Sequence, residues 1–130
     1  MTARLQDAIP STAPDGSEVR PLLSLSRGSM AHFSLPPGQT SRAVAHRTVD
    51  EIWYFLCGRG EIWRRKEDRE EIVRAEAGAC VAIPAGTEFQ FRSFGPDPLE
   101  AIGVTMPPWP GDEEARPVRG IWPPALPQEK

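Results

Sequence analysis

The middle of the chain is a succession of short, apolar-rich runs, each ended by a cluster of turn residues. In the run 88–93, apolar Phe89 and Phe91 alternate with polar Gln90 and Arg92. A period of two places successive side chains on opposite faces, as in a β-strand. Taken together, the runs predict strands at residues 19–25, 29–35, 40–46, 51–57, 61–65, 71–74, 80–83, 88–93 and 99–106.

No segment combines the period of an amphipathic helix with capping residues. Fifteen Pro and eleven Gly in 130 residues supply turns at close intervals, which suits many short strands better than long helices. The pattern therefore predicts an all-β fold with closed or sandwiched antiparallel sheets. The length is that of one domain with one core.

The period of two also predicts which side chains share an inner face. That face is mainly apolar with a few polar groups, which is typical of a small-molecule site. Its residues, the predicted ligand-binding set, are Arg42, Val44, His46, Glu51, Trp53, Phe55, Phe89 and Phe91. The opposite face of the run 51–57, with Ile52, Tyr54 and Leu56, is also apolar, so a second sheet or a partner subunit should cover it.

Composition divides the chain into three predicted segments. Residues 1–18 are expected to form a flexible N-terminal segment, residues 19–106 the β-barrel domain, and residues 107–130 a Pro-rich C-terminal strap. Trp109 and Trp122 in the strap are expected to plug hydrophobic spots on the barrel or on a neighbouring subunit. The strap could equally cover the barrel mouth or present a PxxP ligand, and the sequence does not separate these roles.

Charge and hydropathy limit the class of partner. The formal net charge is −3 and the basic residues are scattered, so nucleic acid is not expected as a partner. No window approaches 18 uninterrupted apolar residues and no secretory signal is visible, so we expect no membrane association and a cytoplasmic location. Cys57 and Cys80 are predicted to be two buried free thiols.

Two spaced patterns lie within residues 38–93. The first runs Gly38, five residues, Val44, one residue, His46, four residues, Glu51, six residues and Gly58. The second runs Gly78, five residues, Pro84, one residue, Gly86, two residues, Phe89, three residues and Ser93. They resemble the two motifs of the cupin family. The resemblance implies a double-stranded β-helix, or jelly-roll, barrel that is commonly a homodimer.

The resemblance also bears on metal binding. Cupins usually hold a metal with three histidines and one glutamate, and here only His46 and Glu51 match those positions. Val44 and Phe89 occupy the positions of the first and third histidines. Two donors fall short of the usual protein ligand set. We therefore expect no tightly held metal, with a weakly bound Fe, Mn, Ni or Zn at His46 and Glu51 as the alternative. Candidate replacement donors are His32, Thr48, Cys80 and Gln90.

Three functions remain open from sequence. The first is a barrel that binds a small polar or sugar-like molecule near His46 and Glu51 without a tight metal. The second is a cupin-type enzyme (an isomerase or epimerase, a decarboxylase or a metal-dependent dioxygenase) with His46 and Glu51 as catalytic residues in proton transfer. The third is a structural or partner-binding barrel whose pocket is vestigial. Complete filling of the centre by Phe89 and Trp53 would favour the third.

Overall fold

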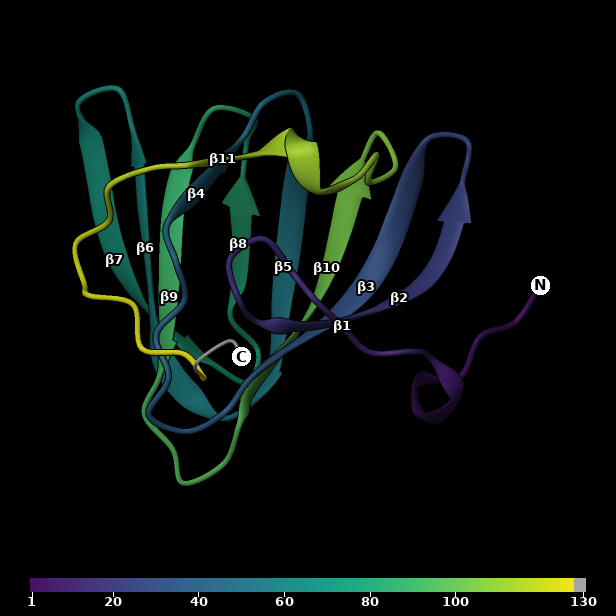
Figure 1. Ribbon diagram of the computed structural model, residues 1–130, viewed down its shortest axis with the longest axis horizontal. Coiled ribbons are helices and arrows are strands. Elements are labelled where there is room, and N and C mark those ends of the chain that lie inside the picture. Colours follow the sequence, from purple (N-terminus) through teal and green to yellow (C-terminus); the bar gives the residue numbers. More distant parts are fainter. Residues whose placement is uncertain (128–130) are drawn as a thin grey trace.

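The computed structural model describes residues 1–127 and contains two antiparallel sheets that face each other (Figure 1). The first sheet has the spatial order β1 (Ser11–Thr12), β2 (Glu18–Leu25), β3 (Gly28–Leu35), β10 (Leu99–Met106), β5 (Asp50–Cys57) and β8 (Cys80–Ile83). The second has the order β11 (Ala115–Pro117), β4 (Val44–His46), β9 (Glu88–Ser93), β6 (Arg59–Lys66) and β7 (Arg69–Glu76). Two single 3₁₀ turns, Leu5–Asp7 and Asp112–Glu114, complete the secondary structure. The predicted all-β jelly-roll fold is confirmed.

Alternation along each strand separates an inner from an outer face. In β5, Glu51, Trp53 and Phe55 are buried, whereas Ile52 and Tyr54 are exposed. The inner faces of both sheets form one hydrophobic core, whose burial supplies most of the stabilisation of a domain this size. Its members include Leu35, Val44, Trp53, Phe55, Ile62, Ile83, Phe89, Phe91 and Leu99.

A motif glycine ends β5 where the chain must turn sharply. Gly58 has a φ of +86°, a conformation that L residues with a side chain rarely adopt. A Cβ at this position would also lie only 2.3 Å from the carbonyl oxygen of Pro98. The glycine is therefore required both by its backbone conformation and by the close approach of the 95–98 loop.

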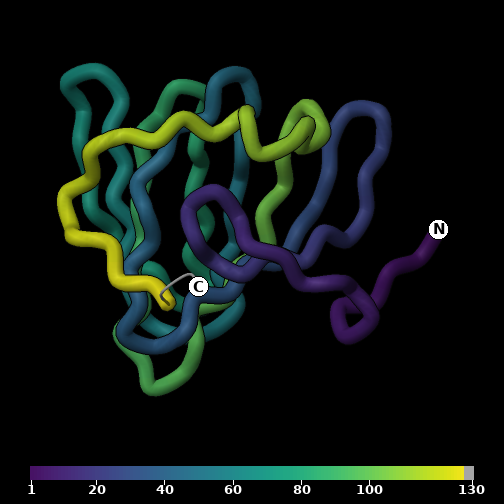
Figure 2. The backbone as a smooth tube through the Cα atoms, in the orientation of Figure 1, coloured from purple at the N-terminus to yellow at the C-terminus, as the bar shows by residue number. Residues whose placement is uncertain are grey.

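The N-terminal and C-terminal segments each contribute one short strand to a sheet. β1, inside the segment expected to be flexible, pairs with β2, and Ala13, Asp15 and Ser17 are buried. β11, inside the predicted strap, pairs with β4, so the C-terminal segment runs back across the second sheet (Figure 2). Residues 128–130, the end of the predicted strap, lie outside the described residues.

The apolar outer face of β5 is not covered by the second sheet, which packs on the opposite side. Ile52, Tyr54 and Leu56 are 44%, 49% and 43% exposed. They continue into β10, where Ile102 is paired with Tyr54 and Val104 with Ile52. The alternative expectation, a partner subunit on this face, therefore stays open.

The two cysteines are free, as predicted, but they are not buried. Cys57 is half-buried at the end of β5 and Cys80 is exposed on β8. Both project from the outer face of the first sheet, which the sequence pattern alone did not reveal. Within residues 1–127, no helix has the length and apolar character needed to cross a membrane.

Candidate functional site

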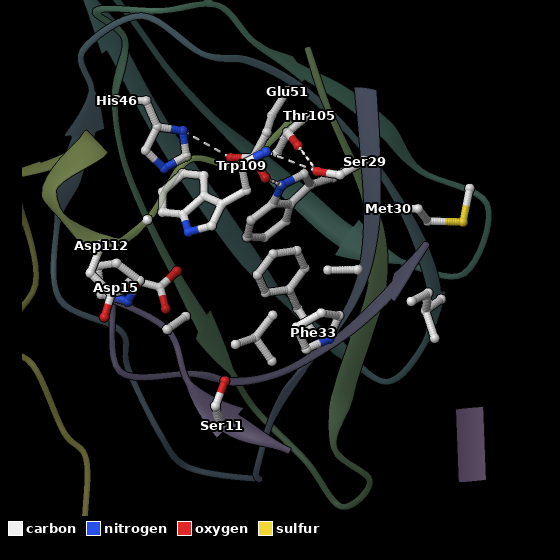
Figure 3. Close-up of a pocket in the computed structure, with 18 of the residues that line it drawn as sticks. Ser11, Asp15, Ser29, Met30, Phe33, His46, Glu51, Thr105, Trp109 and Asp112 are labelled. Atoms are coloured by element: carbon white, nitrogen blue, oxygen red, sulfur yellow. Dashed lines mark hydrogen bonds and ion pairs between the residues drawn. The ribbon is translucent and has the colours of Figure 1, made fainter. Parts of the chain in front are cut away.

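A cavity of about 480 Å³ opens between the two sheets (Figure 3). Its wall combines residues of β1, β2 and β3 with inner-face residues of β4, β5, β9 and β10, and with residues of the turn before β2 and of the tail after β10. The volume lies within the usual range for a small-molecule site. The side chains of the core therefore do not fill the interior completely, although Trp53 and Phe89 are both in its wall.

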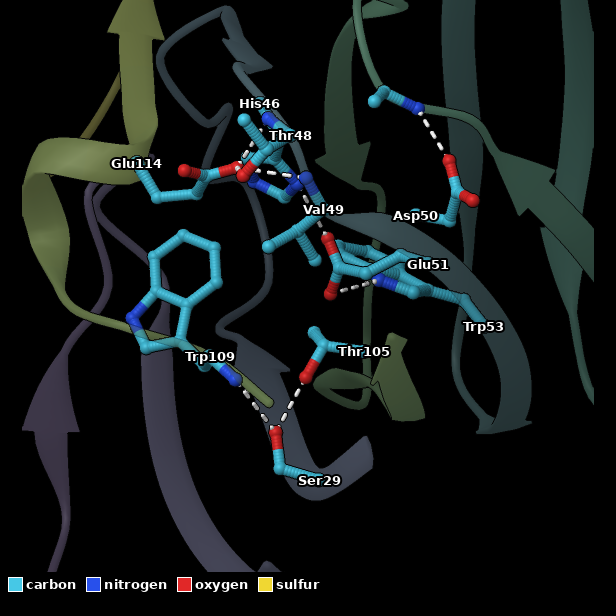
Figure 4. A network of polar contacts seen from close by, with 11 residues as sticks. Ser29, His46, Thr48, Val49, Asp50, Glu51, Trp53, Thr105, Trp109 and Glu114 are labelled. Atoms are coloured by element: carbon cyan, nitrogen blue, oxygen red, sulfur yellow. Dashed lines mark hydrogen bonds and ion pairs between the residues drawn. The ribbon is translucent and has the colours of Figure 1, made fainter. Parts of the chain in front are cut away.

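The central polar contact of the cavity joins β4 to β5. His46 ends β4 and Glu51 is the second residue of β5, and 3.0 Å separates His46 Nδ1 from Glu51 Oε2. The contact is close without being an aligned hydrogen bond. The second carboxylate oxygen, Oε1, accepts a 3.0 Å hydrogen bond from the Trp53 indole Nε1 (Figure 4). Both members of the pair are buried, where the local dielectric strengthens their interaction.

This arrangement orients the imidazole. A carboxylate beside Nδ1 favours a proton on that nitrogen, which leaves Nε2 of neutral His46 as a hydrogen-bond acceptor. The ring lies in the cavity wall, in contact with both Glu51 and Trp109 (Figure 3). The cavity therefore presents a positioned acceptor that could bind a ligand N–H or O–H, or accept a proton.

The turn between His46 and Glu51 is held by the C-terminal segment. Oε1 of Glu114 accepts hydrogen bonds of 2.5 and 2.8 Å from the Thr48 main-chain N–H and hydroxyl, and one of 2.7 Å from the Val49 N–H (Figure 4). Burial opposes ionisation of Glu114, but these bonds outweigh it and lower the pKa of its carboxyl. The tail thus fixes the loop that sets the spacing of the histidine–glutamate pair.

Aromatic rings form most of the remaining wall. Phe33 and Trp53 are stacked with centroids 4.9 Å apart, and Phe89 meets the His46 ring edge-on at 5.2 Å. Gly103 leaves room for this stack, because a Cβ there would lie 2.7 Å from the Phe33 ring and 3.1 Å from Trp53 Nε1. Flat apolar walls of this kind suit a ring-shaped ligand.

The tail contributes one ring to the site. The Trp109 ring meets the His46 ring at a centroid distance of 5.0 Å, and the main-chain N–H of Trp109 donates a 3.0 Å hydrogen bond to Ser29 Oγ. The Ser29 hydroxyl also contacts the Thr105 hydroxyl across the β3–β10 pair. Trp109 therefore packs on the barrel as predicted, at the cavity itself. Trp122 packs elsewhere, against the Arg92 guanidinium at 4.2 Å.

Five of the eight predicted ligand-binding residues lie in the cavity wall. These are Val44, His46, Glu51, Trp53 and Phe89. Phe55 and Phe91 are on the same inner face but are absent from the cavity wall; they are fully packed in the core. Arg42 is exposed and is also absent from the wall, because β4 begins only at Val44 and the alternation does not extend back to it.

The candidate replacement donors are engaged elsewhere. His32, on the outer face of β3, lies with Nε2 2.8 Å from Glu100 Oε1. It is buried there. The Gln90 amide donates to the carbonyls of Ser41 and Trp122, each at 2.8 Å. Thr48 is held by Glu114, and Cys80 is on the exposed outer face.

The donor set does not fit the metal that the fold family implies. Val44 and Phe89 are paired in register across β4 and β9, and both present hydrocarbon to the cavity beside His46. Within residues 1–127, no group of three or more His, Cys, Asp and Glu side chains is arranged to hold an ion. His46 and Glu51 alone would leave most coordination positions to water.

Sequence reasoning missed one buried carboxyl in the cavity wall. Asp15, between β1 and β2, is 4% exposed and lines the cavity with His46 and Glu51. It lies in a stretch rich in Pro, Ser and Gly, which has no periodicity and is typical of a flexible lead-in. Only the tertiary fold brings it to the site.

Comparison with known proteins points to one family. Residues 31–105 match the cupin domain family. A curated relative, the uncharacterized protein MJ1618 of Methanocaldococcus jannaschii, is 30% identical over 105 residues, covering 77% of this chain and 81% of the relative.

Solved structures share the fold at lower identity. A predicted oxalate decarboxylase from Thermotoga maritima has a TM-score of 0.69 at 23% identity, covering 82% of this chain and 98% of that one. Streptomyces Pac13, a nucleoside dehydratase, has a TM-score of 0.73 at 15% identity, covering 94% and 93%. KdgF from Halomonas sp. has a TM-score of 0.69 at 17% identity, covering 82% and 93%. At these identities the likeness concerns the fold alone.

Proposed function

The chain belongs to the cupin domain family, and on that premise we propose that it binds a small polar or sugar-like organic molecule in the barrel, without a tightly held metal. The observation that carries the proposal is the cavity of about 480 Å³ with His46 and Glu51 in its wall. A vestigial site would be filled by its own side chains, and this one is not. The hydrocarbon side chains of Val44 and Phe89 support the metal-free part of the proposal.

The binding chemistry follows from the groups in the wall. Phe33, which stacks on the buried Trp53, offers a flat apolar surface, worth about 0.5–1.5 kcal/mol per aromatic contact beyond the area buried. His46 Nε2 accepts a hydrogen bond from the ligand, while Glu51 fixes the ring that carries it. Pac13, a cupin-fold structure solved with uridine, supports the size class of ligand proposed here.

A second candidate function is metal-independent acid–base catalysis. It is favoured by one observation: a second carboxyl, Asp15, lies in the same cavity as the His46–Glu51 pair. An isomerase, epimerase or dehydratase needs positioned proton donors and acceptors and no redox centre. The decarboxylase and dioxygenase alternatives that rely on a complete metal ligand set gain no support from this donor set.

Uridine binding to chelator-treated protein tests the proposal, with the fluorescence of Trp53 and Trp109 as the signal. We expect His46→Gln to weaken binding at least tenfold, because the acceptor nitrogen is lost. The matched control is His32→Gln, the same substitution at the other histidine, which faces away from the cavity. Equal binding by the two variants, or no binding of uridine or of any member of a sugar and nucleoside set, would refute the proposal.

We also propose that the protein is a homodimer through the outer face of the first sheet. Ile52, Tyr54, Ile102 and Val104 form adjacent cross-strand pairs there, and this face has no covering layer in the described chain. A flat, apolar sheet face can meet a second copy of itself about a twofold axis. Removal of this surface from water would be the driving force for association.

A further inference from the structure

The cavity wall carries negative and neutral groups without a permanent cation. Three carboxyl-bearing residues line it, namely Asp15, Glu51 and Asp112, together with His46. Neither Lys nor Arg is found among its lining residues in the described chain. Proteins that bind carboxylate or phosphate normally supply Arg or Lys for the purpose. An anionic ligand would therefore find no permanent positive charge in this wall to pair with.

Asp15 is fixed in this wall by its own turn. Its Oδ1 accepts hydrogen bonds from the Ser17 N–H at 2.9 Å and from the Ser17 hydroxyl at 2.6 Å. Its carbonyl accepts a 2.7 Å bond from the Arg42 main-chain N–H, which ties the turn to the segment that leads into β4. The adjacent Gly16 has a φ of +92°, and a Cβ there would lie 2.3 Å from Leu126, so the tail packs directly on the turn. The side chain is thus held in one position.

The second oxygen of Asp15 is free to meet a ligand. No hydrogen bond reaches Oδ2 from residues 1–127. Burial raises the pKa of the Asp15 carboxyl, against the two bonds from Ser17, and the Glu51 charge acts in the same direction as burial while His46 opposes it. When this carboxyl carries a proton, it is a hydrogen-bond donor. In that form Asp15 offers the cavity a donor beside the acceptor at His46 Nε2.

We propose that Asp15 is a ligand-binding residue of this cavity and that the site selects an uncharged, flat ring carrying both a hydrogen-bond acceptor and a donor. The acceptor of the ligand meets Asp15 Oδ2, its donor meets His46 Nε2, and its face packs on Phe33, which is backed by Trp53. Ligands that carry a carboxylate or phosphate are rejected because the wall offers no cation to pair with them. The inference rests on the proposed binding function and adds the charge class of the ligand.

Three probes of one shape test the charge class. They are 3-hydroxybenzamide, which is neutral, 3-hydroxybenzoate, an anion, and 3-hydroxybenzylamine, a cation at pH 7. We expect the neutral probe to bind at least tenfold more tightly than the anion, measured by calorimetry or by tryptophan fluorescence. Equal or tighter binding of the anion or of the cation would overturn the charge selection. If none of the three probes bound, the proposed ligand class would be wrong. If the probes bound without a charge preference and His46→Gln lost binding, the charge selection would be wrong and the proposed binding function would stand.

Asp15 itself is tested with an isosteric pair. Asp15→Asn keeps an acceptor for Ser17 and presents an amide N–H in place of the acid O–H, so it should bind the neutral probe within about threefold of the parent. Asp15→Ala should bind it about tenfold more weakly, the worth of one hydrogen bond. The control is Asp7→Asn, an exposed carboxyl in the same N-terminal segment. If Asp15→Ala binds as well as Asp7→Asn, then Asp15 does not contact the ligand.

The protonation of Asp15 has a readout that needs no ligand. Because its pKa is raised in the folded state, the stabilisation it provides is complete below the unfolded value of 3.8 and is lost as pH rises through the folded pKa. Asp15→Asn cannot ionise and should therefore melt at a higher temperature than the parent at pH 8, with little difference at pH 4. If the difference in melting temperature between Asp15→Asn and the parent did not change with pH, Asp15 would not act as a protonated donor. The melting measurement uses only Asp15→Asn and the parent, so it tests the proposal even if Asp15→Ala fails to fold.

Discussion

Removal of the Glu114 carboxylate should destabilise the protein and loosen the site together. One oxygen of this buried side chain accepts three hydrogen bonds, from Thr48 N, Thr48 Oγ1 and Val49 N. A hydrogen bond to a charged group contributes about 1.5–3 kcal/mol, and bonds that share one acceptor are not additive. We therefore expect Glu114→Ala to lose about 3–4 kcal/mol of unfolding free energy. Glu114→Gln keeps the acceptor without the charge and should lose about 1–2 kcal/mol.

Urea denaturation followed by tryptophan fluorescence measures both losses. The matched control is Glu113→Ala, the exposed neighbour in the same 3₁₀ turn, which should change the free energy of unfolding by less than about 0.5 kcal/mol. Equal stability of Glu114→Ala and Glu113→Ala would refute the view that the tail holds the loop before Glu51.

The same contact predicts a pH dependence with a definite sign. The folded state lowers the pKa of Glu114, so its stabilisation is present above the unfolded value of 4.5 and is lost as pH falls through the folded pKa. The stability gap between the parent and Glu114→Gln should therefore be full at pH 7 and should close in acid. A gap that persists unchanged far below pH 4.5 would contradict a charge-assisted contact.

Three further perturbations test the packing, the metal donors and the outer face. Gly103→Ala should cost about 1–3 kcal/mol of unfolding free energy in urea, because the added methyl meets the Phe33–Trp53 stack; an unchanged midpoint would mean that the stack yields freely. The double variant Val44→His with Phe89→His should raise nickel affinity sharply in calorimetry, since both positions face the cavity in register. No gain would show that they do not converge on one point. Tyr54→Glu should convert a dimer into a folded monomer by light scattering, and an unchanged mass would place any partner elsewhere.

The strands were predictable because they depend on local alternation. The nine expected runs correspond to β2–β10, although the run 40–46 is a strand only from Val44. Before that point Thr40 makes isolated bridges to Arg92 and Ala125, so the segment follows the tail rather than a regular ladder. The short strands β1 and β11 were missed, because two or three residues next to proline carry no measurable period.

The sequence predicted which side chains point into the barrel, but it did not predict how far along the barrel each of them lies. A period of two correctly placed His46, Glu51 and Trp53 on the inner side, but it contains no information on height along the barrel. Phe55 therefore shares the face of Trp53 and is packed in the core, away from the cavity. Asp15 could not have been found from pattern, because its role depends on a turn whose position is fixed by distant residues.

Native mass spectrometry of protein purified without added metal or chelator tests the central claim most directly. The account predicts a chain free of stoichiometric metal that binds a neutral ring probe one to one, with binding weakened in Glu51→Gln because the His46 ring loses its carboxylate partner. One Fe, Mn, Ni or Zn ion per chain, lost in Glu51→Gln, would contradict it.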